Sequence, residues 1–301
     1  MTENEFMLQD RISKIKSINE IYDLENNAYV SFSGGKDSTV LHYLIDEALP
    51  ENRIPRVFIN TGIEYKAILK FVRLMAETDN RFEILTVGKN ITETLKNVGY
   101  PFKSKEHSHY LMIYQHSGLS GKTVKNYLGL GEKTRFLSPE ILKYQFSENF
   151  KIKVSDKCCF EFKKKPIADY ESKSGRFITL TGMMKAEGGL RRNITCIVSK
   201  DDGTLKKFHP LAVVSPEFEK WYIESRKIKL CDLYYEPFNF QRTGCKGCPY
   251  SMDLQKQLDV MEVLLPAEKK QCEMIWKPIY EEYRRIGYRL RSEDYKQPSL
   301  F

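Results

Sequence analysis

The sequence has 301 residues and lacks several features that would place it in a special class of protein. No stretch approaches the roughly 20 apolar residues that a membrane span needs. The N-terminal segment lacks the apolar region of a signal peptide. The sequence contains no internal repeat and no low-complexity tract. We therefore expect a soluble, cytoplasmic protein.

The composition indicates a folded core. Hydrophobic residues make up 41% and charged residues 29%, which excludes wholesale disorder. The length corresponds to one large domain or two modest ones. The 48 Lys and Arg residues exceed the 40 Asp and Glu residues by 8, which suits an anionic ligand such as a nucleotide and equally a well-solvated surface. Seven cysteines without an export signal favour metal or redox chemistry over disulfides.

The N-terminal half alternates between helical and strand patterns. After an amphipathic helix, short β-rich runs alternate with segments whose apolar residues recur every three or four positions. Strand–helix repeats of this kind indicate a parallel sheet that is covered on both faces. The expected helices are 3–24, 36–48 and 64–78, and the expected strands are 28–33, 56–60, 81–87 and 178–182.

The strongest local signal is a glycine-containing loop between the first expected strand and the helix that follows it. Gly34 and Gly35 allow the backbone to turn tightly and to approach a ligand closely. The helix that begins near Lys36 offers unpaired N–H groups and the positive end of its dipole, and both favour phosphate. Three hydroxyl groups add hydrogen-bond donors: Ser33, Ser38 and Thr39.

The loop does not follow the common P-loop pattern, which requires a glycine five residues before Gly35. Position 30 is valine, and Lys36 is followed by Asp37 rather than by Ser or Thr. The run Ser-Gly-Gly-Lys-Asp-Ser between a strand and a helix instead resembles the PP-loop of the adenine-nucleotide α-hydrolase-like superfamily. The resemblance implies binding of ATP or a related adenylyl nucleotide, in many members with cleavage at the α-phosphate.

Four of the seven cysteines occur in two pairs. Cys158 and Cys159 are adjacent, and Cys245 and Cys248 form a C-x-x-C pattern in a turn that contains glycine. Such a turn lets two thiolates converge on one metal, and a second pair can complete four sulfur ligands. Zinc also fits four thiolates, and a thioredoxin-like redox pair is a third interpretation, which fits poorly. The other three are expected to be buried apolar residues: Cys196, Cys231 and Cys272.

The cysteine pairs, with a basic segment and Pro166 after the first pair, resemble the [4Fe–4S] signature of assimilatory adenylyl-sulfate (APS) reductases. Together with the loop, they make the chain similar to the phosphoadenosine phosphosulfate (PAPS) reductase family over about 30–250. The resemblance implies an α/β fold with a doubly wound parallel sheet and a C-terminal helical region that carries cysteines. It also implies a [4Fe–4S] cluster, with zinc as the alternative, on Cys158, Cys159, Cys245 and Cys248. Three further segments resemble family motifs: 58–65, 182–191 and 208–211.

The same resemblance assigns a nucleotide site. Lys36 and Asp37 are expected to take part in catalysis. Asn60 stands where the family usually has Asp, and Met184 and Gly188 replace a usual Arg and Ser, so one expected anion contact is missing. The expected cofactor-binding residues are Ser31, Ser33, Gly34, Gly35, Lys36, Asp37, Ser38, Thr39, Asn60, Thr61, Gly62, Gly182, Glu187 and Arg191.

The rest of the chain is less regular. Residues 99–136 are rich in Gly and Lys, which indicates a loop or lid. Within them three residues are candidate contacts to the nucleotide: Lys105, His107 and His109. Ser104 as a helix N-cap is the alternative interpretation. The pattern after 252 predicts two helices that divide near Pro266. We expect an N-terminal helix (1–25), a nucleotide-binding α/β domain (26–212) with an insertion at about 99–150, and a C-terminal helical region with C-x-x-C (213–301).

The sulfonucleotide reductases also carry a late Glu-Cys-Gly-x-His segment whose cysteine attacks sulfur, and this sequence has none. The first hypothesis is therefore an enzyme that binds ATP with Mg²⁺ and catalyses sulfur transfer or adenylation with a [4Fe–4S] cluster. One alternative is a true APS or PAPS reductase that uses Cys272 or a thioredoxin-like partner. Another is a non-catalytic nucleotide-binding subunit of a nucleic-acid-modifying complex. Expected partners are an adenine nucleotide, a nucleic-acid acceptor and a sulfur donor.

Overall fold

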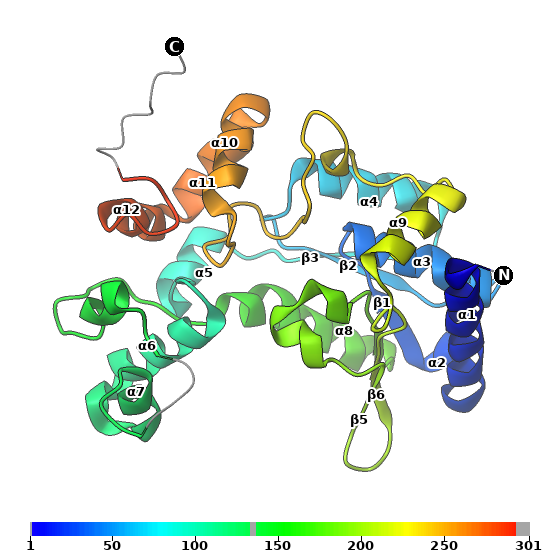
Figure 1. Cartoon of the computed structure of the whole chain (residues 1–301), viewed down its shortest axis with the longest axis horizontal. Coiled ribbons are helices and arrows are strands. Elements are labelled where there is room, and N and C mark those ends of the chain that lie inside the picture. Colours follow the sequence, from blue (N-terminus) through cyan, green and yellow to red (C-terminus); the bar gives the residue numbers. More distant parts are fainter. Residues whose placement is uncertain (1, 133–136, 293–301) are drawn as a thin grey trace. The chain divides into compact units, whose positions relative to one another are not determined.

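A computed structural model describes residues 2–132 and 137–292 (Figure 1). The chain forms two compact units, and each unit is built from two separate segments. Unit 1 comprises the residues up to 87 together with 166–244, and unit 2 comprises 88–165 together with the residues from 245 onward. Within the described residues, no helix has both the length and the apolar character that crossing a membrane requires.

Unit 1 contains a six-stranded sheet in the order β3-β2-β1-β4-β6-β5. Every neighbouring pair is parallel except β5 and β6, which pair antiparallel at one edge. The expected α/β fold with a mainly parallel sheet is confirmed, whereas β5 and β6 were not expected. The strands are β1 (Ala28–Ser31), β2 (Arg56–Asn60), β3 (Phe82–Thr86), β4 (Ile178–Leu180), β5 (Ile197–Ser199) and β6 (Leu205–Phe208).

Both faces of this sheet are buried, as a doubly wound sheet requires. Side chains alternate along a strand, so Ala28 and Val30 of β1 join one core, which also contains residues of α1, α3 and α9. Tyr29, between them, packs on the other face with Val57 and with Tyr170 of α8. The helices of unit 1 are α1 (Glu3–Tyr22), α2 (Leu24–Asn27), α3 (Lys36–Ala48), α4 (Lys66–Thr78), α8 (Lys165–Ser174) and α9 (Pro216–Ser225), with short 3-10 helices at Lys185–Glu187, Gly189–Asn193 and Asp232–Tyr234.

Unit 2 is helical in its described residues. The expected pair of helices after residue 252 is three helices, because a second proline, Pro278, begins a new helix just as Pro266 does. Proline is favoured in the first turn of a helix, where its missing N–H costs nothing. The helices are α5 (Ile91–Val98), α6 (Lys105–Ser117), α7 (Lys122–Tyr127), α10 (Leu254–Leu264), α11 (Pro266–Ile275) and α12 (Lys277–Arg285), with shorter helical turns at Gly118–Ser120, Glu140–Gln145 and Phe160–Lys164.

The loop or lid expected at 99–136 is wrong for most of that segment, which forms α6 and α7; residues 133–136 lie outside the described residues. Ser104 caps α6, because its hydroxyl accepts the N–H of His107 at 3.1 Å. The imidazole of His107 is buried between the hydroxyl of Tyr127, at 2.9 Å, and the amide oxygen of Gln145, at 2.8 Å. His107 is therefore a hydrogen-bonded core residue, and the N-cap interpretation is confirmed.

Candidate nucleotide site and candidate metal centre

The glycine loop of unit 1 connects β1 to α3. Gly34 has φ +70°, and a Cβ atom there would lie 2.8 Å from Cγ2 of Ile68, so both its conformation and its packing require glycine. A Cβ atom at Gly35 would lie 3.2 Å from the hydroxyl oxygen of Thr243 and 3.3 Å from that of Tyr234. The loop is thus held tightly between α4 on one side and residues 234–243 on the other.

Hydroxyl groups fix the shape of this loop. The Ser38 hydroxyl donates to the carbonyl of Gly35 at 2.9 Å and accepts the N–H of Ser33 at 3.2 Å. The N–H of Lys36, the first residue of α3, donates to the hydroxyl of Tyr234 at 2.9 Å. That N–H has no partner within the helix, and phosphate is a ligand that donors at the start of a helix favour. In this structure the Tyr234 hydroxyl accepts it, and the role of the loop as an anion site stays a prediction.

A cavity of about 290 Å³ opens in unit 1 beside the loop. It contains seven of the residues that the sequence assigned to the nucleotide site. Helix α3 begins at the carboxyl end of β1, where the chain order of the sheet changes from β1 to β4, and open α/β sheets bind ligands at such a point. The lining residues are Ser33, Gly35, Lys36, Asp37, Ser38, Glu187, Arg191, Tyr234, Gln241, Arg242, Thr243 and Gly244.

The other predicted binding residues do not line this cavity. Ser31 ends β1, and the Thr39 hydroxyl donates to the carbonyl of Gly35 at 3.0 Å. The segment after β2 is folded on itself, because Glu64 accepts both the N–H and the hydroxyl of Thr61. Gly34, Asn60, Gly62 and Gly182 are likewise absent from the lining. Their roles in binding stay predictions.

Gly182, after β4, lies against the first turn of α3. A Cβ atom there would be 2.6 Å from the carbonyl oxygen of Asp37 and 3.1 Å from the backbone nitrogen of Ser38. Backbone atoms cannot move aside as a flexible side chain can, so only glycine lets β4 approach the loop this closely.

We expect Gly182→Ala to destabilise unit 1 by about 1–3 kcal/mol, because the added methyl group overpacks a rigid contact. Thermal unfolding followed by circular dichroism measures the effect. Gly88→Ala is the matched control, since a Cβ atom at Gly88 meets no atom within 4 Å. Equal melting temperatures for the two variants would contradict the packing argument.

At the cavity, three charged side chains of α3 and α9 form a cluster in which Glu219 is buried and Lys36 and Asp37 are half-buried. The ammonium group of Lys36 lies 2.7 Å from Oε2 of Glu219, whose side chain is only 1% exposed. Burial, followed by the charge of Asp37, raises the pKa of Glu219 to about 7. Burial, followed by the charge of Glu187, also raises the pKa of Asp37. The site therefore holds two carboxyl groups that resist being ionised together.

Two arginines complete the charge of the cavity. Arg191 and Arg242 both pair with Glu187, and the Arg242 contact measures 2.9 Å. Both guanidinium groups remain partly exposed and line the cavity, so an anion can compete with Glu187 for them. Four residues at this site were not predicted from the sequence: Tyr234, Arg242, Thr243 and Glu219. They belong to no phosphate-binding motif, and only the folded structure brings them next to the loop.

The four paired cysteines all belong to unit 2. Cys158 is buried, and its pKa is raised by burial and then by the charges of Cys245, Cys159 and Cys248, so the two pairs lie close enough to interact. Among the described residues, however, three or more of these sulfur atoms do not form a group within 4.8 Å of one another. The four-cysteine metal centre is therefore not confirmed. Cys231 and Cys272 are buried as expected, whereas Cys196 is half-buried.

Hydrogen bonds from Trp276, between α11 and α12, and from Tyr280 of α12 hold the C-x-x-C turn in place. The hydroxyl of Tyr280 donates to the carbonyl of Gly247, and the indole N–H of Trp276 donates to that of Lys246 at 3.2 Å. The ammonium group of Lys246 is buried and lies 3.2 Å from Glu268, which is buried as well. Gly247 has φ +59°, and its Cβ would lie 2.8 Å from the sulfur of Cys272. The turn is therefore presented by a rigid support.

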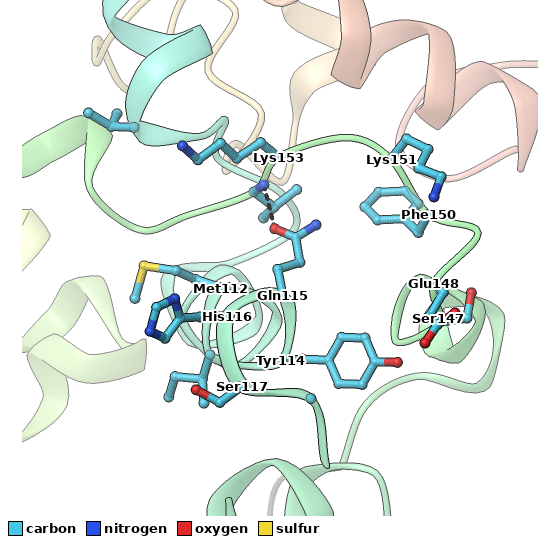
Figure 2. Close-up of a pocket in the computed structure, with 14 residues that line it drawn as sticks. Met112, Tyr114, Gln115, His116, Ser117, Ser147, Glu148, Phe150, Lys151 and Lys153 are labelled. Atoms are coloured by element: carbon cyan, nitrogen blue, oxygen red, sulfur yellow. Dashed lines mark hydrogen bonds between the residues drawn. The ribbon is translucent and has the colours of Figure 1, made fainter. Parts of the chain in front are cut away.

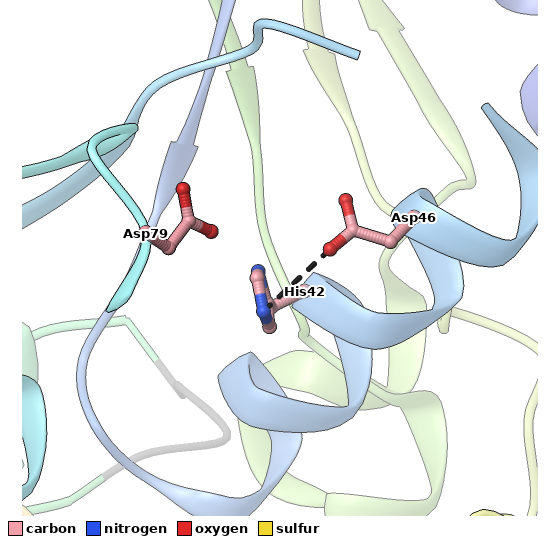
Figure 3. A group of neighbouring side chains, drawn as sticks. All are labelled: His42, Asp46 and Asp79. Carbon is pink, nitrogen blue, oxygen red and sulfur yellow. Dashed lines mark ion pairs between the residues drawn. The ribbon is translucent and has the colours of Figure 1, made fainter. Parts of the chain in front are cut away.

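A second group of metal-ligating side chains lies in unit 1, where ligand atoms of His42, Asp46 and Asp79 lie within 4.8 Å of one another (Figure 3). Arginines already neutralise its carboxylates. Arg81 binds Asp46 at 2.8 Å and Asp79 at 2.7 Å, and Arg56 binds Asp46 at 2.7 Å. The side chains form a structural ion-pair network rather than a metal site.

Unit 2 also contains a groove of about 1040 Å³ between α6 and residues 147–154 (Figure 2). Its polar groups are largely used within the chain. The amide of Gln115 donates to the carbonyl of Ile152 at 2.7 Å and accepts the N–H of Val154 at 3.0 Å. The ammonium group of Lys153 donates to the carbonyl of Asn97 at 2.5 Å. These contacts attach the segment to α6 and α5.

Several known proteins are similar to this chain. An uncharacterized protein of Methanocaldococcus jannaschii is 34% identical over 104 residues, which are 32% of this chain and 25% of that relative. The PAPS reductase of Candida auris is 18% identical with a TM-score of 0.43 over 73% of this chain and 81% of that one. The U34-tRNA thiolase of Methanococcus maripaludis, solved with its [4Fe–4S] cluster, is 16% identical with a TM-score of 0.39 over 94% of this chain and 80% of that one.

A family model also matches most of the chain. It describes the phosphoadenosine phosphosulfate reductase domain and matches residues 27–251. The matched segment begins just before β1, includes the glycine loop and the cavity residues, and ends after the C-x-x-C turn. The chain therefore belongs to the phosphoadenosine phosphosulfate reductase domain family.

Proposed function

We propose that this protein binds ATP, or a related adenylyl nucleotide, at the glycine loop and transfers the adenylyl group to an acceptor with release of pyrophosphate. The observation that carries the proposal is the cavity beside the loop. A helix N-terminus, the ammonium group of Lys36 and two guanidinium groups meet there around a space of about 290 Å³. Such a set of donors suits the phosphates of a nucleotide rather than an uncharged ligand.

The side chains have distinct tasks in this reaction. An oxygen or sulfur atom of the acceptor forms a bond to the α-phosphorus while the bond to the bridging oxygen of pyrophosphate breaks. Lys36, together with the loop N–H groups, would stabilise the charge that develops on the phosphate oxygens. Arg191 and Arg242 would hold the leaving pyrophosphate, which arrives with Mg²⁺ as part of the nucleotide. Asp37 and Glu187 would keep these cations oriented.

We also propose that Cys158, Cys159, Cys245 and Cys248 hold a [4Fe–4S] cluster, with zinc as the alternative. Four thiol groups are the donor set that such clusters use. Burial, together with the charges of neighbouring thiolates, raises the pKa of Cys158, and a bound cation would relieve this cost by neutralising the thiolates. Lys163 acts in the same direction. When bound, a cluster would supply a site for sulfur in sulfur-transfer chemistry.

The structure does not favour a reductase that uses its own thiol as nucleophile. Cys272 is fully buried, and burial raises the pKa of its thiol to about 12. A thiol of this kind is neither ionised near neutral pH nor accessible to a substrate. A reductive reaction would therefore need a thiol from a separate protein.

An exchange assay tests the proposed activity. The purified protein, with ATP and Mg²⁺, is expected to exchange labelled pyrophosphate into ATP, or to form AMP and pyrophosphate when candidate nucleic-acid or sulfur acceptors are added. Sulfite release from APS or PAPS with thioredoxin and its reductant would instead indicate the reductase. Nucleotide binding without any turnover would indicate the non-catalytic subunit. Absence of both binding and turnover would contradict the proposal.

A further inference from the structure

A carboxyl group that belongs to no recognised motif lies under the glycine loop. Glu219 is in the first turns of α9, and its side chain is 1% exposed and does not line the cavity. One oxygen, Oε2, contacts the ammonium group of Lys36 at 2.7 Å. The other oxygen, Oε1, is buried and has no hydrogen-bond partner among the described residues.

An unpartnered carboxylate oxygen in the interior is costly, and a single proton removes the cost here. The carboxyl groups of Asp37 and Glu219 are close enough for one to donate a hydrogen bond to the other, provided that one of them is protonated. The arrangement is that of two acids that share a proton. Asp37 lines the cavity, so the shared proton lies at the boundary between the interior and the ligand.

We propose that Glu219 is a positioning residue that holds the ammonium group of Lys36 and shares one proton with Asp37, so that the positive charge offered to phosphate depends on pH. The proposal rests on the proposed function, because it concerns the same nucleotide site. With the proton bound, Lys36 is opposed by one carboxylate of this pair. With the proton lost, it is opposed by two, and its attraction for phosphate falls.

The surrounding charges are consistent with this assignment. The groups that act on Glu219 are Lys36 and Asp37 of α3. Those that act on Asp37 from outside the pair are Glu187, Lys36 and Arg191. Further along α9, Arg226 pairs with Glu47 of α3 at 2.6 Å. On α1, which also packs against α9, Arg11 pairs with Asp10 and donates to the carbonyl of Pro210 at 3.3 Å. Arg226 and Arg11 therefore each have a carboxylate partner of their own, and the proton is shared between Asp37 and Glu219.

The direction of the pH dependence follows from the pKa of Glu219. It is raised to about 7 in the folded protein, so the carboxyl group is mainly protonated below that pH and ionised above it. The affinity for nucleotide phosphates is therefore expected to fall as the pH rises from about 6 to about 8, by roughly tenfold, which corresponds to one pKa unit of coupling. The folded state also loses stability as the pH rises from about 4.5, the ordinary pKa of the group, to about 7, because over that range it holds a proton that the unfolded state releases.

Two measurements on the full chain test the proposal. The first is the dissociation constant of a non-hydrolysable ATP analogue with Mg²⁺ at several pH values. Glu219→Gln keeps a neutral side chain at every pH. We therefore expect it to remove the fall in nucleotide affinity that accompanies ionisation of Glu219. Glu217→Gln is the matched control, because Glu217 is exposed on the same turn of α9. Parallel pH profiles for the wild type and Glu219→Gln would overturn the proposal even if the nucleotide binds well.

The second measurement needs no nucleotide. Carbon NMR of labelled glutamate side chains is expected to show one carboxyl group that titrates near pH 7 in the wild type and in Glu217→Gln, and that is missing in Glu219→Gln. Absence of this signal from the wild type would show that no proton is shared. If the signal is present but no nucleotide binds at any pH, the proposed function fails while the proton-sharing pair stands.

Discussion

Replacing Lys36 with methionine is expected to lower the rate of ATP cleavage by about 100- to 1000-fold, the usual loss when one preorganised donor to a transition state is removed. Lys36 is the first residue of α3 and lines the cavity. In the proposed complex its ammonium group would face the phosphates. Methionine preserves the unbranched apolar part of the side chain, so the change removes mainly charge. Pyrophosphate release in single-turnover experiments measures the effect.

The loss of Lys36 also leaves Glu219 without its partner at 2.7 Å. A buried charge that loses its partner usually costs several kcal/mol. Glu219 can avoid this cost by remaining protonated below about pH 7, since its pKa is already raised to about 7. The assay is therefore run near pH 6.5, with a melting curve for each protein. Lys229→Met, at an exposed lysine, is the control, and an equal loss of rate in both variants would refute a specific role for Lys36.

Replacing Cys248 with serine is expected to remove the cluster. The protein purified without oxygen should contain about four irons per chain, and the variant should contain at least tenfold less. The prediction follows from the position of Cys248 in the turn whose carbonyl groups accept hydrogen bonds from Trp276 and Tyr280. Metal analysis and the visible absorbance spectrum measure the change.

Cys196→Ser is the control for that experiment, because Cys196 lies in unit 1 and is not one of the four paired cysteines. It should retain the iron of the wild type. One zinc per chain in the wild type would show that the site holds zinc rather than an iron–sulfur cluster. Iron that persists in Cys248→Ser would show that the ligand assignment is wrong.

The sequence predicted the strands on either side of the glycine loop well, because those elements are local patterns. The run from β1 to β3 has short apolar strands, amphipathic helices and a glycine loop, and the strands at 56–60, 82–86 and 178–180 agree with the predicted ones within two residues. Strands β5 (sequence IVS) and β6 (sequence LKKF) were not predicted. Both are short and partly exposed, and neither shows a clear alternation of apolar and polar residues.

The residues around the loop were only partly predictable. Lys36, Asp37, Glu187 and Arg191 were found because they stand in segments that resemble family motifs. Glu219 was missed because a glutamate in the first turn of a helix is ordinarily explained by the helix dipole, and nothing local shows that it faces Lys36. His107 was placed in the wrong environment for the converse reason, since a histidine near lysines looks like an anion contact until its burial is known.

The division of each unit into two separated segments has a consequence for the order in which the protein assembles. Residues 88–165 leave the ribosome before the second segment of unit 1 and well before residues 245 onward, with which they share a core. The central sheet cannot receive β4 until residue 180 has been made, nor β6 until residue 208 has been made. Cys158 and Cys159 must wait still longer for Cys245 and Cys248. If the four cysteines form the proposed metal centre, metal loading would therefore have to wait until residues 245–248 have been made.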